Sequence, residues 1–352
     1  MNIAILDYTL SKTQRKWNTA TFNMLKQLAN LYIVNCPDYY ERLDINSNVF
    51  MFNTKISQKK NSKSSFLNRI SIIDNMRINS KLFKEFKDVK FDAVFIMGFE
   101  IITLSLYRFF IPKNIPIYLV QHQQIDELEN RIKRFFFNKY KNKVNHIVLE
   151  EIYGKHLKEK YGVNNIHVVH HIALSEKREV SKERKFTKPL ILGISSNNDE
   201  NMIAEIIKEQ KEKKFLNNKN VFLYLRSKKY VYEDEFLKIG YSFLTPEEYE
   251  ELYNEAVAII AVVPSTFHDR ISGPVMDAIA NGKVVFTSNE NVISIFGERA
   301  PSMFRYFENM EEFSDILNEK EWKVKASELE NIQKIHGSEN ILKDYSLFLN
   351  KE

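Results

Sequence analysis

The chain has 352 residues, too many for one ordinary hydrophobic core, and this length predicts two domains of roughly 150–200 residues each. Its single cysteine, Cys36, excludes an intrachain disulfide and a zinc site built on cysteines, and it indicates a reducing, cytoplasmic setting. A net charge of +5 is too small to indicate a nucleic-acid partner.

The N-terminal half alternates short apolar runs with amphipathic stretches. Met1–Asp7 lacks the features of a secretory signal and is typical of a buried first strand. No apolar run reaches the ~20 residues of a membrane-spanning helix, so we expect a soluble protein or one bound peripherally at the inner face of the membrane. The strand-like runs are Asn2–Leu6, Leu31–Val34, Ala93–Met97, Ile115–Val120 and His146–Leu149. A helix-like stretch, Gln14–Asn30, follows the first of them, and this alternation predicts a parallel sheet covered on both faces.

A polar passage, Ser175–Lys188, contains six lysines and arginines and is the predicted linker. The alternation then restarts and predicts a second α/β domain. The predicted strands are Leu190–Ile194, Val221–Leu225, Tyr241–Phe243, Ala258–Val262 and Val284–Thr287, and the predicted helices are Glu200–Lys211, Pro246–Glu255, Gly273–Asn281, Asn309–Leu317 and Glu321–Asn350. We therefore expect an N-terminal domain over 1–172, a C-terminal domain over 173–335, and a final helix over 336–352 that crosses back to the first domain.

The loop Pro264–Gly273 carries the strongest functional signal. It joins a buried strand to a helix that begins at Ser272-Gly273-Pro274, a good helix start. Backbone N–H groups and the helix dipole at such a start form a site for a diphosphate, and Arg270 adds a cation there. Asp277 lies one turn into the helix, where its carboxylate can reach the hydroxyls of a ribose.

Asp269 and Asp277 are separated by seven residues, and Asp277–Val285 reads Asp-Ala-Ile-Ala-Asn-Gly-Lys-Val-Val. This pattern resembles the GT-B glycosyltransferases, in particular the mostly retaining group with an E-x7-E motif (glycosyltransferase family 4-like). The resemblance implies two Rossmann-like domains facing each other across a cleft, with the acceptor on the N-terminal side. It also implies metal-independent transfer of a hexosyl group from a UDP- or GDP-sugar, with no cofactor.

By the same resemblance, Asp269 contacts the donor sugar, the backbone of Ile271, Ser272 and Gly273 holds the diphosphate, and Asp277 binds the ribose. Leu244 and Thr245 correspond to residues that line the nucleobase pocket. The family's arginine–lysine pair after the first C-terminal strand is replaced here by Gly193–Asp199. The cationic role therefore passes to Arg226 and Arg270, and the neutral candidates for contacting phosphate are Ser195, Ser196 and Asn197.

In the N-terminal domain, His122 follows the strand Ile115–Val120. A histidine at this place in GT-B enzymes faces the donor sugar, so His122 is a catalytic candidate, and Glu100 is the candidate on the acceptor side. If the enzyme inverts the sugar's configuration, one of these two residues is the expected base. The adjacent His170 and His171 point to opposite faces of an extended segment and do not predict a metal site.

The expected partners are a nucleotide-sugar donor and a glycan, lipid-linked or protein-linked acceptor, as in the synthesis of bacterial surface polysaccharides. Phe135–Phe137, with its flanking cations, fits a peripheral membrane contact or a buried helix face. The sequence does not decide between a monomer and a homo-oligomer. The alternatives to transfer are a catalytically silent GT-B subunit that stabilises or targets a partner glycosyltransferase, a nucleotide-sugar 2-epimerase and a phosphorylase.

Overall fold

The computed structural model describes residues 1–11, 14–36, 39–40, 43, 45–54, 65–174, 186–195, 197–242, 244–264, 266–319 and 321–349. It divides into two compact units. Unit 1 comprises Met1–Ile172 and Ser338–Glu352, and unit 2 comprises Ala173–Gly337. Most of the predicted linker, residues 175–185, lies outside the described residues, as does Ser196.

Unit 1 contains a seven-stranded sheet with the order β3-β2-β1-β4-β5-β6-β7, in which all neighbouring strands are parallel. The strands are β1 (Asn2–Asp7), β2 (Asn30–Asn35), β3 (Val49–Asn53), β4 (Ala93–Gly98), β5 (Ile117–Gln121), β6 (Asn145–Val148) and β7 (Ile166–Val168). The strand order reverses between β1 and β4. The loops after these two strands therefore diverge at the carboxyl edge, where ligands of such sheets bind.

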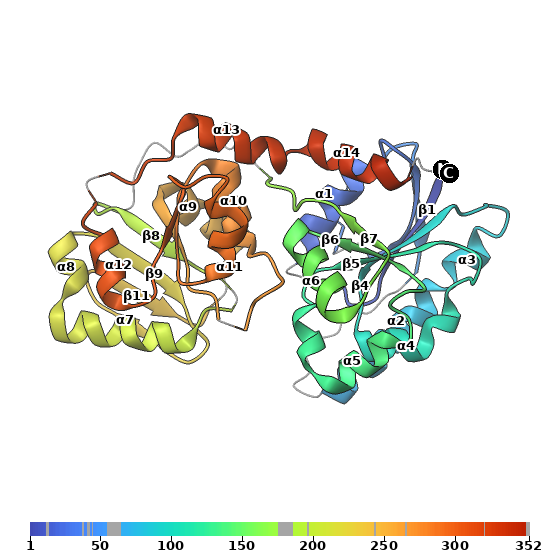
Figure 1. Ribbon diagram of the computed structural model, residues 1–352, viewed down its shortest axis with the longest axis horizontal. Helices are drawn as coiled ribbons and strands as arrows, with labels where there is room; N and C mark the ends of the chain where they lie inside the picture. Colours follow the sequence, from blue (N-terminus) through green and yellow to red (C-terminus); the bar gives the residue numbers. More distant parts are fainter. Residues whose placement is uncertain are drawn as a thin grey trace. The chain divides into compact units, whose positions relative to one another are not determined.

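Helices cover both faces of the unit 1 sheet (Figure 1). They are α1 (Arg15–Leu25), α2 (Ser65–Asn79), α3 (Leu82–Glu85), α4 (Ile101–Tyr107), η1 (Arg108–Phe110), η2 (Asp126–Glu129), α5 (Arg131–Asn138), α6 (Glu151–Tyr161) and α14 (Ser338–Leu349). All six residues of β4 are buried, which explains its unbroken apolar sequence. The last helix, α14, contributes Tyr345 and Phe348 to the core, and the Phe348 ring lies 4.4 Å from that of His167.

Unit 2 contains a second seven-stranded sheet, with the order β10-β11-β9-β8-β12-β13-β14. Its strands are β8 (Leu190–Gly193), β9 (Phe222–Arg226), β10 (Tyr232–Glu233), β11 (Leu237–Gly240), β12 (Ala256–Ala261), β13 (Val284–Thr287) and β14 (Phe304–Tyr306). Only the edge strand β10 is antiparallel to its neighbour in this sheet. The strand order reverses between β8 and β12, so the carboxyl ends of these strands mark the expected ligand site.

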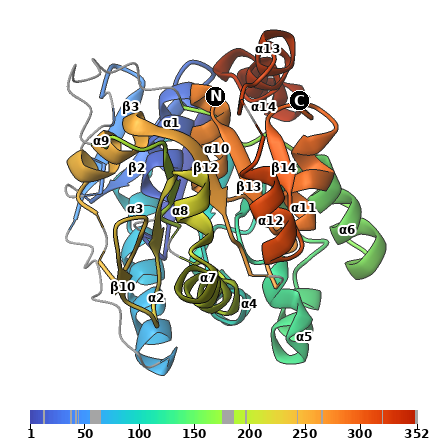
Figure 2. The same ribbon diagram turned by 90° about the vertical axis from the view of Figure 1, so that its left-hand side faces the viewer.

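The helices of unit 2 are α7 (Glu200–Lys213), α8 (Phe215–Lys219), α9 (Pro246–Glu255), α10 (Gly273–Asn281), α11 (Glu290–Val292), η3 (Ile293–Gly297), α12 (Met310–Ile316) and α13 (Ala326–Ile335). Helices α7 and α12 contact each other and cover one face of the sheet (Figure 2). Ile206 of α7 and Phe313 of α12 pack into one buried cluster with Leu223 and Phe286 of the strands. Apolar burial of this kind is the main stabilising contribution to such a unit.

The predicted fold class is confirmed, because both units are parallel-dominated α/β layers. Helices α9 and α10 and strand β13 have the predicted bounds. The predicted strand Tyr241–Phe243 is wrong, since the strand is β11, where Leu237 and Ile239 are buried, whereas Tyr241 is 53% exposed. The predicted single helix Glu321–Asn350 is also wrong, because α13 ends at Ile335 and α14 starts at Ser338, after Gly337.

Candidate functional site

In unit 2, hydrogen bonds tie together the loops at the point where the strand order reverses. The N–H of Asp199, after β8, donates to the carbonyl of Val262, after β12, at 2.7 Å. The Asn198 side-chain amide donates to the carbonyls of Gly193 and Arg226 at 2.9 and 2.7 Å, and so links the ends of β8 and β9. Asn198 was not singled out from the sequence, although it lies in the loop that follows β8, where ligands of such sheets bind.

Two cations lie at the end of β9. Arg226 is 8% exposed, and burial lowers the pKa of its guanidinium, an effect opposed by nearby Glu200. Lys228, which no sequence pattern singled out, is exposed, and its ammonium group donates a hydrogen bond to Asn197 Oδ1. The backbone N–H of Lys228 also donates to Glu200 Oε1 at 2.7 Å. The structure therefore gathers Arg226, Lys228 and Asn197 at the carboxyl edge, with the half-buried Ser195 in the adjoining loop.

The N-terminus of α10 carries a buried hydroxyl that lacks a hydrogen-bond partner. Ser272 is the N-cap residue, but its side chain makes no capping bond, and its Oγ has no partner among the described residues. A buried hydroxyl without a partner is unfavourable, so this atom is suited to a ligand. The next residue, Gly273, is exposed, and a Cβ built there would meet no described atom within 4 Å. The exposed Gly273 leaves the backbone of this helix start open to an anion, beside the buried Ser272 hydroxyl.

The loop that precedes α10 is held by Asn289, the N-cap residue of α11, and by a contact within the loop. Asn289 donates its side-chain amide to the Phe267 carbonyl at 3.2 Å. The Arg270 guanidinium lies over the Phe267 ring, 3.8 Å from its centroid, in a cation–π contact. Asp269 is 4% exposed, and Ile271 is half-buried. Asp269 and Arg270 thus belong to an ordered loop that leads directly into the α10 N-terminus.

Asp277 on α10 is oriented by a tyrosine from another helix. The Tyr249 hydroxyl of α9 donates to Asp277 Oδ2 at 2.7 Å, and the Tyr249 ring stacks on Tyr253 at 5.6 Å. Burial and the neighbouring Asp277 carboxylate raise the pKa of Tyr249, so its hydroxyl stays protonated as a donor. Tyr249 was missed because the facing of α9 and α10 is not visible in the sequence.

Leu244 and Thr245 precede α9. The Thr245 hydroxyl accepts from the Glu248 N–H at 3.2 Å, and the Glu248 carboxylate accepts from the Thr245 N–H at 2.7 Å. These two bonds form a capping box, so the Thr245 hydroxyl is already used to stabilise the start of α9. Leu244 is half-buried, and its predicted contact with a nucleobase stays a prediction.

In unit 1, His122 lies at the carboxyl edge in a fixed loop. The N–H groups of His122 and Gln123 both donate to Gln124 Oε1, at 2.9 and 3.1 Å. The His122 ring meets Trp17 of α1 edge-on, with 4.6 Å between centroids. Its Nε2 atom is buried and has no hydrogen-bond partner among the described residues. Burial, and to a smaller extent His171, lower the pKa of His122 to about 3, so the ring is neutral near pH 7.

Glu100 acts as the N-cap of α4. Its Oε2 accepts from the N–H and the hydroxyl of Thr103, at 2.8 and 2.7 Å, and its other oxygen lies 3.7 Å from Arg69. The Thr103 bonds account for Oε2 as the helix cap, whereas the buried Oε1 has no hydrogen-bond partner among the described residues. Its assignment to the acceptor side stays a prediction.

Asp7, at the end of β1, was not singled out from the sequence. Its buried carboxylate accepts from the N–H of Leu10 at 2.9 Å and from the Asn18 side chain at 2.9 Å. A Cβ at Gly98 on the neighbouring strand would lie only 2.4 Å from Asp7 Oδ1. Glycine at position 98 therefore makes room for the carboxylate that shapes the β1–α1 loop.

The remaining candidates of the N-terminal half have structural partners. His170 donates from its backbone N–H to Asp344 Oδ2 of α14 at 3.1 Å, and its ring Nδ1 lies 2.9 Å from the same oxygen. Within Phe135–Phe137, Phe137 is buried and Phe135 is 59% exposed. Among the residues that the structure describes, no group of three or more His, Cys, Asp or Glu side chains could hold a metal ion. No helix in that part of the chain is long and apolar enough to cross a membrane.

Solved structures with the same architecture were found by structural comparison. HepE of Anabaena, solved in complex with UDP-glucose, superposes with a TM-score of 0.62 at 11% identity, over 100% of both chains. AviGT4, a glycosyltransferase of avilamycin A biosynthesis, superposes with a TM-score of 0.58 at 10% identity, over 100% of this chain and 97% of its own. A UDP-N-acetylglucosamine 2-epimerase superposes with a TM-score of 0.53 at 13% identity, over 100% and 97%.

No protein-family model matches the chain, and no curated protein matches it in sequence. At these low identities the structural matches establish architecture, and the same architecture occurs in transferases and in an epimerase. The chain therefore has the GT-B fold, with two Rossmann-like domains.

Proposed function

We propose that the protein is a glycosyltransferase. It transfers a hexosyl group from a nucleotide-sugar, with UDP favoured, to a glycan, lipid-linked or protein-linked acceptor in surface polysaccharide or glycoconjugate synthesis. The observation that carries this proposal is the buried Ser272 hydroxyl, which has no hydrogen-bond partner in the described part of the chain and lies at the N-terminus of α10, beside the reversal of strand order. A diphosphate oxygen would satisfy that hydroxyl and the helix dipole together. The UDP-glucose complex of HepE, a protein of the same fold, agrees with this choice of donor.

The proposed roles follow from the positions of the side chains. Ser272 and the Gly273 N–H hold the diphosphate, and Arg226 and Lys228 neutralise the charge that develops as it departs. Asp277, oriented by the Tyr249 hydroxyl, binds the ribose hydroxyls. In this mechanism the protein's own cations and helix dipole take the place of a divalent metal ion.

Asp269 contacts the donor sugar in this proposal, and His122 donates or accepts a hydrogen bond as a neutral ring. The lowered pKa of His122 excludes an imidazolium there above about pH 4. If the reaction inverts the sugar, His122 can act as the base only if its pKa rises when substrates bind, because a ring with a pKa of about 3 takes a proton poorly from an acceptor hydroxyl. If the reaction retains the configuration of the sugar, the role of His122 is to orient the donor sugar through hydrogen bonds.

The proposal is tested by thermal unfolding of the full chain with UDP-, GDP-, CMP- and dTDP-sugars. We expect one nucleotide class to raise the melting temperature, since a ligand that binds only the native state stabilises it by mass action. Asp277→Asn should remove that increase. Asp315→Asn, an exposed carboxylate on α12, is the matched control and should keep it.

Each remaining outcome points to one alternative. If no nucleotide-sugar stabilises the protein, the donor site is refuted. Stabilisation without transfer to any acceptor, and without donor hydrolysis, would favour a catalytically silent subunit. Conversion of UDP-N-acetylglucosamine at C2 would favour an epimerase instead.

A further inference from the structure

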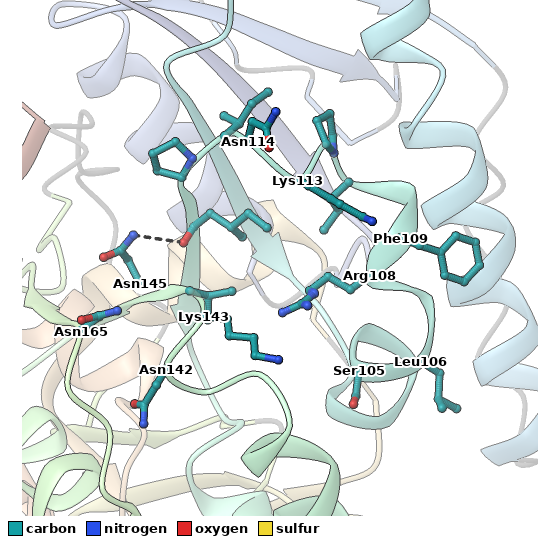
Figure 3. Close-up of a pocket in the computed structure, with 16 residues that line it drawn as sticks. Ser105, Leu106, Arg108, Phe109, Lys113, Asn114, Asn142, Lys143, Asn145 and Asn165 are labelled. Carbon is teal, nitrogen blue, oxygen red and sulfur yellow. Dashed lines mark hydrogen bonds between the residues drawn. The ribbon is translucent and has the colours of Figure 1, made fainter.

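A groove of about 800 Å³ lies at the amino edge of the unit 1 sheet (Figure 3). It is formed by η1, the loop that leads into β5, and the loop that leads into β6. Ligands of doubly wound sheets bind at the carboxyl edge, where His122 lies, so this groove is separate from the candidate catalytic residues of unit 1. Its volume is that of a site for a small ligand or for a few units of a chain.

The groove is cationic. Arg108, Lys113 and Lys143 line it, and none of its described lining residues is an aspartate or a glutamate. Figure 3 shows the Arg108 and Lys143 side chains reaching into the space between η1 and the loop before β6. A single-sign lining of this kind attracts anions and repels cations.

A second groove, of about 730 Å³, continues the first. The two share Phe109, Ile111, Pro112 and Lys113. The second adds three cations from α2 and from the segment of α3, and its described lining residues again include no acidic one. The six cations of the two grooves are Arg77, Lys81, Lys84, Arg108, Lys113 and Lys143. Within the described part of the chain, none of the six forms an ion pair. Their charge is therefore available to a partner.

Side-chain amides supply the second type of contact. Asn114, Asn142, Asn145 and Asn165 line the first groove. Asn145 is held by its own bond to the Ile117 carbonyl at 3.5 Å, drawn in Figure 3, whereas Asn114 and Asn165 are exposed. Amides both donate to and accept from hydroxyl groups, which makes them suitable for sugars as well as for oxyanions.

The shape of the two grooves favours one kind of anionic partner, a chain, over another, a membrane surface. Two adjoining concave grooves fit a chain that lies along them, whereas a flat bilayer surface would leave their floors unfilled. Phe109 is 68% exposed and lines both grooves, and an aromatic ring of this kind offers an apolar face to a sugar ring. Cations, amides and an exposed aromatic side chain together favour a sugar polymer that bears negative charge.

We propose that the two grooves form an exosite for an anionic glycan, a sugar chain that carries phosphate or carboxylate groups. The further assignment of this glycan as the acceptor rests on the proposed glycosyl transfer. The exosite would hold the chain away from its reacting end. Because β5 has five residues at about 3.3 Å each, the two edges of the sheet are roughly 16 Å apart, and only a chain of several sugar units would reach the exosite.

The test measures binding of fluorescent oligogalacturonate and of a glycerol phosphate oligomer to the full chain, with a neutral maltooligosaccharide alongside. We expect at least one anionic probe to bind, more weakly as salt rises, and the neutral probe not to bind. The triple variant Arg108→Gln, Lys113→Gln, Lys143→Gln should bind about tenfold more weakly. The control triple variant, Lys87→Gln, Lys155→Gln, Lys158→Gln, removes three exposed charges of the same unit outside the grooves and should stay within about twofold.

The exosite is refuted if neither anionic probe binds, or if both triple variants lose affinity equally. It is also refuted if the protein prefers phosphatidylglycerol vesicles or an oligonucleotide, which would identify a membrane or a nucleic acid as the partner. Nucleotide-sugar stabilisation is measured on the same variants. An unchanged nucleotide response with lost glycan binding separates this exosite from the donor site, so either assignment can fail alone.

Discussion

The orientation of Asp277, the most specific residue of the candidate donor site, depends on a partner that could not be predicted from the sequence. Its spacing from Asp269 singled it out, but Tyr249, 28 positions earlier, fixes its orientation through a 2.7 Å hydrogen bond. A carboxylate that is already held by a hydrogen bond loses less rotamer freedom when it binds a ligand. Tyr249 is therefore expected to act as a positioning residue for donor binding.

Tyr249→Phe should raise the KM for the nucleotide-sugar by roughly tenfold with little change in kcat, because it removes one charge-assisted hydrogen bond that orients Asp277. Steady-state kinetics with the donor varied would measure this. Tyr253→Phe, on the ring stacked beneath Tyr249, leaves the bond intact and should keep the wild-type KM. Equal effects of the two substitutions would mean that the packing of α9, and not the hydrogen bond, matters.

His122 should make the stability of the protein depend on pH. Its pKa is about 3 in the folded chain and about 6.5 when unfolded, so between these values the unfolded state binds the extra proton. His122 therefore contributes a loss of stability as the pH falls from 6.5, about 2 kcal/mol between pH 7 and pH 5, and the buried His146, whose pKa is lowered to about 4, adds a loss of the same sign. Urea unfolding at the two pH values should show a smaller loss for His122→Gln. His268 is exposed, so the His268→Gln variant is the control and should lose as much stability as the wild type between the two pH values.

At the scale of elements, long periodic stretches were predictable and short edge strands were not. Helices α9 and α10 carry their own start signals, a capping box and a Ser-Gly-Pro sequence, so their bounds were predicted from local residues. Strands β10 and β14 have two and three residues, and they form only because a neighbouring strand supplies hydrogen bonds. Their sequences carry no period long enough to predict a strand.

Two glycines at the carboxyl edge of the second sheet should respond differently to alanine. A Cβ at Gly193 would lie 2.4 Å from Leu225 and 2.6 Å from Ile260, so Gly193→Ala should destabilise the protein by about 1–3 kcal/mol. Gly273→Ala meets no described atom within 4 Å and should leave the melting temperature nearly unchanged. It should nevertheless reduce stabilisation by the nucleotide-sugar, since a methyl group would then stand beside the diphosphate. A large loss of stability in Gly273→Ala would contradict this assignment of the helix start.

At the scale of the whole molecule, the end of the chain completes the unit in which the chain began. Helix α14 belongs to unit 1 although the preceding helix, α13, belongs to unit 2. Tyr345 is fully buried there, and Asp344 accepts from the His170 N–H at 3.1 Å. The stability of unit 1 should therefore depend on residues far from it in the sequence.

Tyr345→Ala should destabilise unit 1 by about 3–5 kcal/mol, as expected when a large buried aromatic side chain is removed. Leu347→Ala, two residues further along the same helix and 56% exposed, is the control and should change stability little. Hydrogen exchange of β4 and β5 would report the change, since these strands lie beneath α14 through Phe95 and Tyr118. Unchanged exchange in Tyr345→Ala would mean that unit 1 is stable without this contact.

The two α/β units, the helix start at Ser272 and the spacing of Asp269 and Asp277 follow from local sequence alone. Buried parallel strands need continuous apolar runs, and helix starts need particular local residues, so both can be predicted from short stretches of sequence. Only the tertiary structure brought Tyr249 to Asp277, Trp17 to His122, and η1 to the loop before β6. These pairings join residues far apart in the chain, and packing of side chains between elements decides them, which local periodicity does not encode.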